Sequence, residues 1–237
     1  MAGFFIFNGE NSLDYGLRVT NSPATSFPTR IVESYQVPGR SGNLTFDTGA
    51  YGNVSQTYEC WYRNKEASSY ELEAFLADWL MKPRGYQILE DSYFPDVFRK
   101  ALYVGSAEIE SFWEKYGRIS IEFDCMPQKW LKSGEYFLDI GNGMQVYNEW
   151  EPALPLFQIS GAGSGTLTVG EYSMEISEIP AAGLTIDCDL QNAYSGTQNC
   201  NSLLSADEFP RLQPGTTAIS FSGGITEIKM KPRWWKL

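Results

Sequence analysis

The sequence predicts a mainly β protein with one helix, and three observations support this class. Short runs rich in Val, Ile, Thr, Tyr, Phe and Trp recur along the chain and are separated by Gly, Pro, Asn or Ser, which is the pattern of strands joined by turns. A single segment spaces its apolar residues with the period of a helix. With 237 residues, 43% of them hydrophobic, the chain is long enough to bury about one or two cores.

The strand-like runs are clearest in the first half of the chain. Residues 3–7 predict the first strand, because no basic residue precedes this apolar run and no small-residue cleavage site follows it, as a secretory signal would require. Further strands are expected at residues 31–37, 54–62, 98–104 and 118–125. The last of these alternates apolar with polar residues, so one face should be core. That face carries Ile119, Ile121, Phe123 and Cys125.

The predicted helix begins near residue 68, where Ser68 and Glu71 have the spacing of a capping box. It ends before Pro83 and Gly85, which interrupt helical structure. We expect its apolar stripe to close the end of a β-sandwich or barrel rather than to hold a cofactor. The stripe consists of Leu72, Phe75, Leu76, Trp79 and Leu80.

A domain boundary is expected where the strand signals weaken, across residues 128–143, which include Gly134, Gly141 and Gly143. We place the two domains at residues 1–131 and 132–237. Pro152 and Pro155 then favour an extended segment that leads into a strand at residues 156–160.

Charge is unevenly distributed over the chain. Residues 1–132 carry 13 Lys and Arg against 17 Asp and Glu, residues 133–210 carry none against 11, and residues 211–237 carry 5 against 1. The anionic middle segment would repel phosphates, which argues against a broad nucleic-acid surface there. It is either a solvated acidic face or the complement of a basic neighbour. No apolar run approaches the roughly 20 residues of a membrane span.

Enzymatic chemistry is disfavoured because the chain contains no histidine, the usual general base and a common metal ligand. The tetrapeptide Asp47-Thr48-Gly49-Ala50 has the sequence of an aspartic protease turn. Such enzymes need two carboxylates that share a proton, and only one copy is present. We therefore interpret these residues as an ordinary turn.

No cofactor or metal site is expected. The run from Gly161 to Gly165 leads into a strand and not a helix, so it predicts a hairpin turn and not a phosphate-binding loop. Asp187 and Asp189 could contribute to a calcium site, but further ligands are not identifiable.

The four cysteines lack the CxxC spacing of zinc and redox sites. Cys60 and Cys125 are expected as buried apolar residues. Cys188 and Cys200 bracket a loop that could close as a disulfide, although a reducing cytosol disfavours one.

Short motifs stand in a fixed order at both ends of the chain. The N-terminal set is Phe4 to Gly9, Ser12, Asp14 to Leu17 and Val37 to Gly42, and the C-terminal set is Leu184 to Cys188, Ala193-Tyr194, Phe209 to Gly215 and Lys231 to Trp235. Together they resemble the distal tail proteins of siphophages, often called Dit, over most of residues 1–125 and 152–237. The chain departs from the family at Ser41, where an acidic residue is frequent.

The resemblance implies an N-terminal β hub domain with one helix, followed by a C-terminal β-sandwich like that of galectins or carbohydrate-binding modules. It also implies a structural virion protein without enzymatic activity, cofactor, membrane segment or nucleic-acid recognition. Copies of the hub domain would form a hexameric ring that joins the tail tube to the tail tip or baseplate. The expected partners are the chain itself, the tail tube protein, a tail-associated or tip protein and host-adsorption proteins, in the virion and, during assembly, in the host cytoplasm.

The match to family positions also implies a subunit interface on the terminal strands of the hub domain. The interface candidates are Phe5, Phe7, Pro38, Gly39 and Arg40. The closing pair Trp234-Trp235 is expected to anchor the terminal strand in a core.

The alternative function is a carbohydrate-binding module that recognises cell-wall glycans. Sugar sites need aromatic faces and polar groups, and the acidic second domain supplies both. The candidate sugar contacts are Tyr147, Trp150, Tyr172 and Tyr194. The histidine of galectin sites is missing, and a shared fold does not grant a function.

Overall fold

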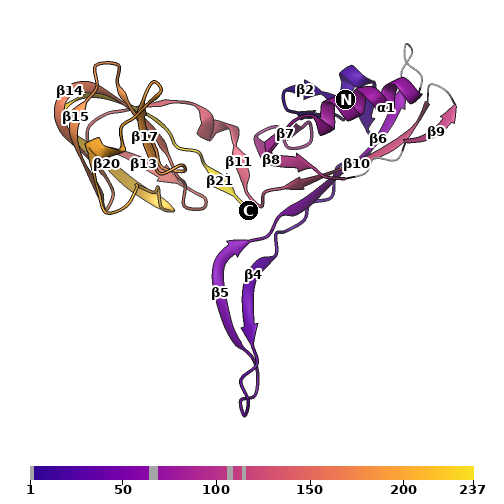
Figure 1. Ribbon diagram of the computed structural model, residues 1–237, viewed down its shortest axis with the longest axis horizontal. Helices are drawn as coiled ribbons and strands as arrows, with labels where there is room; N and C mark the ends of the chain where they lie inside the picture. The colour runs from indigo at the N-terminus through magenta and orange to yellow at the C-terminus, as the bar shows by residue number, and fades with distance from the viewer. Residues whose placement is uncertain (1–2, 64–68, 106–108, 114–115) are drawn as a thin grey trace. The chain divides into compact units, whose positions relative to one another are not determined.

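The computed structural model describes residues 3–63, 69–105, 109–113 and 116–237. The chain divides into two compact units, one of Met1–Lys129 with Leu237 and one of Trp130–Lys236. This division falls two residues before the boundary expected from the sequence. Both units consist mainly of antiparallel strands, and α1 (Ser69–Met81) is the one α-helix of the described residues (Figure 1). The predicted fold class is therefore confirmed.

The first unit contains one large antiparallel sheet with strands in the order β2-β1-β7-β8-β10-β6-β3, and β9 pairs with β10 outside this path. The short 3-10 helix η1 (Ser12–Tyr15) lies between β2 and β3. A bridge from Gly3, just before β1, to Val19 in β3 brings the two ends of the sheet together, so the sheet closes around a core. The strands are β1 (Phe5–Phe7), β2 (Glu10–Asn11), β3 (Leu17–Val19), β6 (Val54–Arg63), β7 (Gln87–Asp91), β8 (Val97–Tyr103), β9 (Ile109–Trp113) and β10 (Tyr116–Cys125).

Aromatic rings fill the centre of this core. The Phe5 ring stacks on Tyr58 of β6 at 4.8 Å and on Trp79 of α1 at 5.4 Å between ring centroids. It also meets Phe123 of β10 edge to face at 5.6 Å. The indole N–H of Trp79 donates to the carbonyl of Phe7 at 3.0 Å, which fixes the helix against β1. The helix thus covers the core, as its apolar stripe predicts.

The details of the helix prediction are partly right. Four residues of the stripe are buried: Leu72, Leu76, Trp79 and Leu80. Phe75 was expected among them and is 52% exposed, so that assignment is wrong. At 100° per residue, position 75 lies at the border of the face that the other four define. Ser68 of the predicted capping box lies outside the described residues.

The inward face of β10 is confirmed, since its predicted core residues are at most 1% exposed. Cys60 and Cys125 are likewise buried, as expected. Burial raises the pKa of each thiol to about 12, because the thiolate would have to leave water. At neutral pH both cysteines are therefore packing groups and not nucleophiles.

A separate two-stranded sheet completes the first unit. It is the hairpin of β4 (Arg30–Tyr35) and β5 (Leu44–Tyr51), drawn in violet in Figure 1. None of its side chains belongs to the aromatic core.

The second unit is built on the long antiparallel pair β14 and β20. The sheet order is β12-β20-β14-β16-β17-β18, with β13 also on β20, β15 on β14 and β19 on β15. The 3-10 helices are η2 (Lys132–Glu135) and η3 (Asn201–Leu203). The strands are β11 (Lys129–Leu131), β12 (Leu138–Ile140), β13 (Met144–Asn148), β14 (Leu156–Val169), β15 (Tyr172–Ile179), β16 (Leu184–Asp187), β17 (Asn192–Ser195), β18 (Gln198–Asn199), β19 (Leu204–Ser205), β20 (Gly215–Lys231) and β21 (Trp235–Lys236).

The glycine-rich run in β14 is not the hairpin turn that the sequence predicts. Residues 161–165 continue the strand through two shifts of register against β20. A Cβ atom on Gly161 would lie 2.1 Å from the carbonyl oxygen of Gly224, and one on Gly224 would lie 1.7 Å from the carbonyl oxygen of Ala162. The glycines are therefore needed for the close approach of two bulged strands, which the local sequence does not distinguish from a turn.

We expect Phe5→Ala to lower the free energy of unfolding of the first unit by about 3 to 5 kcal/mol, because the substitution leaves a cavity among packed rings. Urea unfolding followed by near-UV circular dichroism measures the loss. Phe75→Ala is the matched control and should cost less than about 1 kcal/mol, since that ring already faces water. Equal losses in the two variants would contradict the assigned core.

Candidate assembly surface

The β4–β5 hairpin differs from the rest of the first unit because it has no buried residues of its own. Every residue from 29 to 50 is exposed. This includes large apolar side chains, with Phe46 62% and Tyr35 55% exposed. An isolated two-stranded hairpin is only marginally stable in water, and exposed apolar surface of this kind marks a contact site.

The register of the hairpin gives its two faces different characters. Glu33 lies opposite Phe46 and Tyr35 lies opposite Leu44, so these side chains share one face. Ile31 alternates onto the same face. The hairpin is therefore amphipathic. We call the surface formed by Ile31, Tyr35, Leu44 and Phe46 the apolar face of the hairpin; it also carries Glu33, which accepts a hydrogen bond from the Tyr35 hydroxyl at 2.6 Å.

The opposite face is more polar and internally bonded, although it also carries Val32, which is 42% exposed. Arg30 Nη1 lies 2.9 Å from Asp47 Oδ2 in an ion pair. Asn43 Nδ2 donates to Ser34 Oγ at 3.0 Å. The backbone N–H of Gly49 and then the Arg30 guanidinium lower the pKa of Asp47, since both stabilise the carboxylate. The polar groups of the hairpin are therefore bonded within it, whereas the apolar side chains of the other face remain exposed to water.

The same contacts decide the nature of the Asp47-Thr48-Gly49-Ala50 segment. It lies within β5, so the predicted turn is wrong, although Gly49 has a left-handed φ of 72° beside a break in register. Asp47 Oδ1 accepts the N–H of Gly49 at 2.9 Å and Oδ2 receives Arg30. Its two oxygens hold the strand together and do not share a proton with a second carboxylate, as protease catalysis would need.

The tip of the hairpin carries the candidate interface residues Pro38, Gly39 and Arg40. The N–H of Arg40 donates to the carbonyl of Val37 at 3.2 Å, and Gly39 has φ of 81°. Proline followed by a left-handed glycine is the pattern of a type II turn. All three residues are exposed. They are available for contact, and their role stays a prediction.

The other two interface candidates are differently placed. Phe5 and Phe7 are 0% and 1% exposed in the aromatic core. Strand β1 also has both neighbours, with β2 on one edge and β7 on the other. Neither ring offers a surface to another subunit, so they are corrected to core residues. An apolar strand at a chain terminus gives the same sequence signal in either case.

The candidate sugar contacts lie on separate elements. Tyr147 on β13 is 68% exposed, and Trp150 lies under Lys236, whose Nζ is 4.8 Å from the ring centroid. Tyr172 Oη accepts Gln213 Nε2 at 3.5 Å, and Tyr194 lies on β17. Among the described residues no ring contact joins two of the four. The sugar-binding hypothesis stays a prediction.

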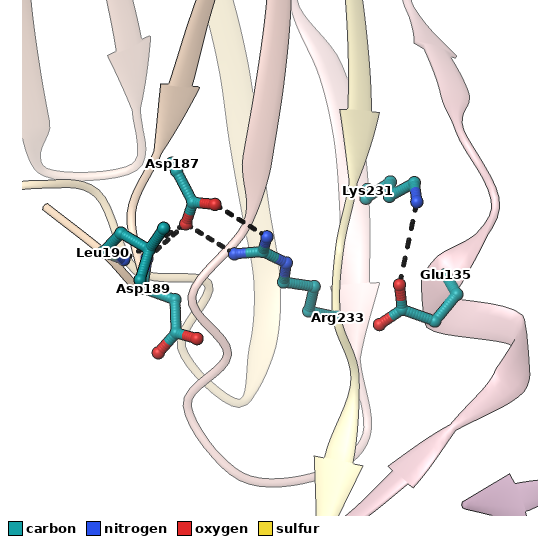
Figure 2. A network of polar contacts seen from close by, with 6 residues as sticks. All are labelled: Glu135, Asp187, Asp189, Leu190, Lys231 and Arg233. Atoms are coloured by element: carbon teal, nitrogen blue, oxygen red, sulfur yellow. Dashed lines mark hydrogen bonds and ion pairs between the residues drawn. The ribbon is translucent and has the colours of Figure 1, made fainter. Parts of the chain in front are cut away.

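The two aspartates considered for a calcium site, Asp187 and Asp189, lie beside Arg233 (Figure 2). The Asp187 carboxylate receives Arg233 Nη1 at 2.7 Å and Nη2 at 2.9 Å, and it accepts the N–H groups of Asp189 and Leu190 at 3.1 Å. Within the described residues no group of three or more Cys, Asp or Glu could hold a metal ion. The calcium hypothesis is therefore replaced by an ion pair that fixes the C-terminal segment.

Other contacts tie down the same segment. The indole N–H of Trp235 donates to the carbonyl of Pro152 at 2.9 Å, and Trp234 and Trp235 pack against the core of the unit, as predicted. Cys188 and Cys200 are buried free thiols, so the disulfide considered from the sequence is not formed.

Burial raises the pKa of Asp187, but the hydrogen bonds from Arg233 and from the Leu190 N–H outweigh this effect, so the pKa lies below its ordinary value. Arg233 itself has φ of 56°, which only the bonded surroundings make acceptable.

Across the described residues no helix has both the length and the hydrophobicity that crossing a bilayer requires.

Comparison with solved structures gives the fold a precedent. The Dit protein (gp 19.1) of phage SPP1, a paradigm of the hub adsorption apparatus in phages that infect Gram-positive bacteria, matches with a TM-score of 0.77 and 12% identity, over 100% of both chains. A chain of the phage p2 baseplate in its activated conformation with Sr matches with a TM-score of 0.49 and 10% identity, over 99% of this chain and 100% of that one. No protein-family model matches the sequence, and no curated protein does. The resemblance predicted from the sequence is confirmed as a likeness of fold.

We expect Asp187→Asn to destabilise the second unit by about 3 kcal/mol at pH 7, because Arg233 keeps its charge in a largely buried site. The stabilisation is present above the ordinary carboxyl pKa of 3.8 and is lost as the pH falls through the lower folded value. Urea unfolding at pH 7 and near pH 2.5 measures both stabilities. Asp189→Asn is the control, since in Figure 2 only the Asp187 carboxylate contacts Arg233. A variant difference that does not shrink at low pH would contradict the ion pair.

Proposed function

We propose that the protein is a structural component of a phage tail, because its fold resembles that of the SPP1 Dit protein over the whole of both chains. Its copies form a hexameric ring that joins the tail tube to the tail tip or baseplate and carries the host-adsorption proteins. The first unit is the ring-forming hub, and the second is a galectin-like β-sandwich that serves as a platform for adsorption components. The function is assembly, without catalysis or a cofactor.

The observation that carries this proposal is the uncovered apolar face of the hairpin. A side chain such as Phe46 gains about 2 kcal/mol when it is fully buried, so four neighbouring apolar residues favour a contact strongly. Neither hydrophobic core of the described residues includes them, and a second copy would supply a surface to cover them. A hairpin of one subunit laid on the body of the next makes a head-to-tail contact, and such contacts close into rings when the rotation permits.

The likeness to the SPP1 protein gives independent support, since that protein is a paradigm of the hub adsorption apparatus. The remaining partners follow from this position in the tail: the tail tube protein, a tail-associated or tip protein and receptor-binding proteins. The protein is expected to function in the virion and to be assembled in the host cytoplasm. Pro38, Gly39 and Arg40 at the hairpin tip are proposed to contact the neighbouring subunit.

Light scattering after size exclusion, with negative-stain images of the same peak, tests the ring directly. We expect a hexamer that appears as a ring. A strict monomer at every concentration, with or without the tail tube protein, would contradict the proposal. A monomer retained on a cell-wall glycan array would instead favour the carbohydrate-binding module.

We expect Phe46→Asp to abolish or strongly weaken ring formation, because it places a charge on the face that must be desolvated. Thr45→Asp is the matched control. It is the preceding residue of β5, points to the polar face and should leave the ring intact. Both variants should keep the thermal unfolding of the wild type, since neither residue is buried. Equal loss of rings in both would show that the faces are not distinct.

A further inference from the structure

A second exposed surface of the first unit lies on the outer face of β3, β6 and β10. The registers place Arg18 of β3 beside Trp61 of β6, and Trp61 beside Arg118 of β10. Two residues further along β6, Arg63 lies beside Tyr116 of β10. We call these five residues the arginine–aromatic patch. The inward neighbours on the same strands are core, so all five side chains share the solvent face.

The patch holds two of its three cations over aromatic rings. The guanidinium carbon of Arg118 lies 4.4 Å from the centroid of Trp61, and that of Arg63 lies 5.5 Å from the centroid of Tyr116. Each ring is 42% exposed. A guanidinium stacked on a ring is held in place before any ligand arrives, and that of Arg63 presents a planar fork of N–H donors that suits a carboxylate. Cation–π packing thus prepares the surface for an anion.

Two hollows flank the Trp61 ring. One, of about 600 Å³, has walls that include Leu13, Arg18, Trp61, Arg63 and Tyr116. The other, of about 310 Å³, lies between Thr20, Trp61 and Arg118, with Glu59 on its wall. The larger hollow combines apolar and cationic walls. The chemistry of its walls therefore suits a segment that carries both acidic and apolar side chains.

Two of the three arginines of the patch carry a charge that no carboxylate of the described residues neutralises. In the described part of the chain, neither Arg18 nor Arg63 forms an ion pair. Among the described residues, two carboxylates border the patch: Glu59, which accepts a hydrogen bond from the Ser120 hydroxyl at 2.9 Å, and Glu110, which lies opposite Arg118 on β9. The patch keeps a positive surplus in a chain whose net charge is −11.

From this geometry we propose that the arginine–aromatic patch docks an acidic, partly apolar segment of a partner protein. Arg18 and Arg63 both line the larger hollow together with the Trp61 and Tyr116 rings, so a segment seated there meets two guanidinium groups and two aromatic walls. A nucleic acid fits less well, because its continuous row of phosphates would face the rest of an acidic chain. Carboxylates at a few positions meet the arginines without that repulsion.

Fluorescence anisotropy tests the proposal with a labelled peptide of alternating Glu and Leu and the full chain. We expect binding that weakens about tenfold or more in the double variant Arg18→Gln/Arg63→Gln, since charge-assisted hydrogen bonds are lost. Raising the ionic strength from about 0.01 M to about 0.15 M should also weaken binding. Arg84→Gln, an exposed arginine outside the patch, is the control and should bind as the wild type does.

Several results would overturn the proposal: no binding to the wild type, equal binding of a peptide with Gln in place of Glu, or equal weakening by Arg84→Gln. Tighter binding of a duplex DNA, lost in the double variant, would assign the patch to phosphates instead. Near-UV circular dichroism checks the fold of each variant. If the double variant does not fold, the single variant Arg18→Gln, on an exposed position of the short edge strand, provides the same comparison with an expected loss of about fivefold.

Discussion

The packing of aromatic rings around Phe5 is the interaction on which the first unit depends. One ring contacts β6, α1 and β10, so a single residue of the first strand ties together elements that are far apart in the sequence. The indole of Trp79 adds a hydrogen bond to the same strand. These contacts fill the interior of the closed sheet. The hairpin contributes no residue to this core, and its apolar face is exposed.

Both proposed contact surfaces follow from the alternation of side chains along a strand. In β6 and β10, the residues that face inward build the core, and the residues that face outward form the arginine–aromatic patch. In the hairpin neither face has a core behind it, so alternation separates a polar face from an apolar one. The two surfaces differ in chemistry: one gains by burying apolar area, and the other by pairing charge. They can therefore serve different partners.

In the second unit, close strand packing and the position of the C-terminal segment depend on contacts within the unit. Its long strands approach so closely that glycines are required where they are bulged, and its C-terminal segment is held by the bidentate pair of Asp187 and Arg233. An acidic side chain that resembles a metal ligand in the sequence is thereby used to fix the end of the chain. The surplus of acid in residues 133–210 remains as a solvated or partner-facing charge.

The sequence by itself determined the strand class, the helix and the inward face of β10, because periodicity and turn residues act over a few neighbours. The likeness to a known fold was indicated by the order of short motifs at both ends of the chain. The sequence did not determine that Phe5 and Phe7 are core residues, that residues 161–165 continue a strand, or that Asp187 meets Arg233. Nor did it indicate the apolar face of the hairpin or bring Arg18, Trp61 and Arg118 together. Each of these depends on which segments lie side by side, and pairing between distant segments is decided by the tertiary structure, since only there do packing and charge compensation select one partner for each side chain.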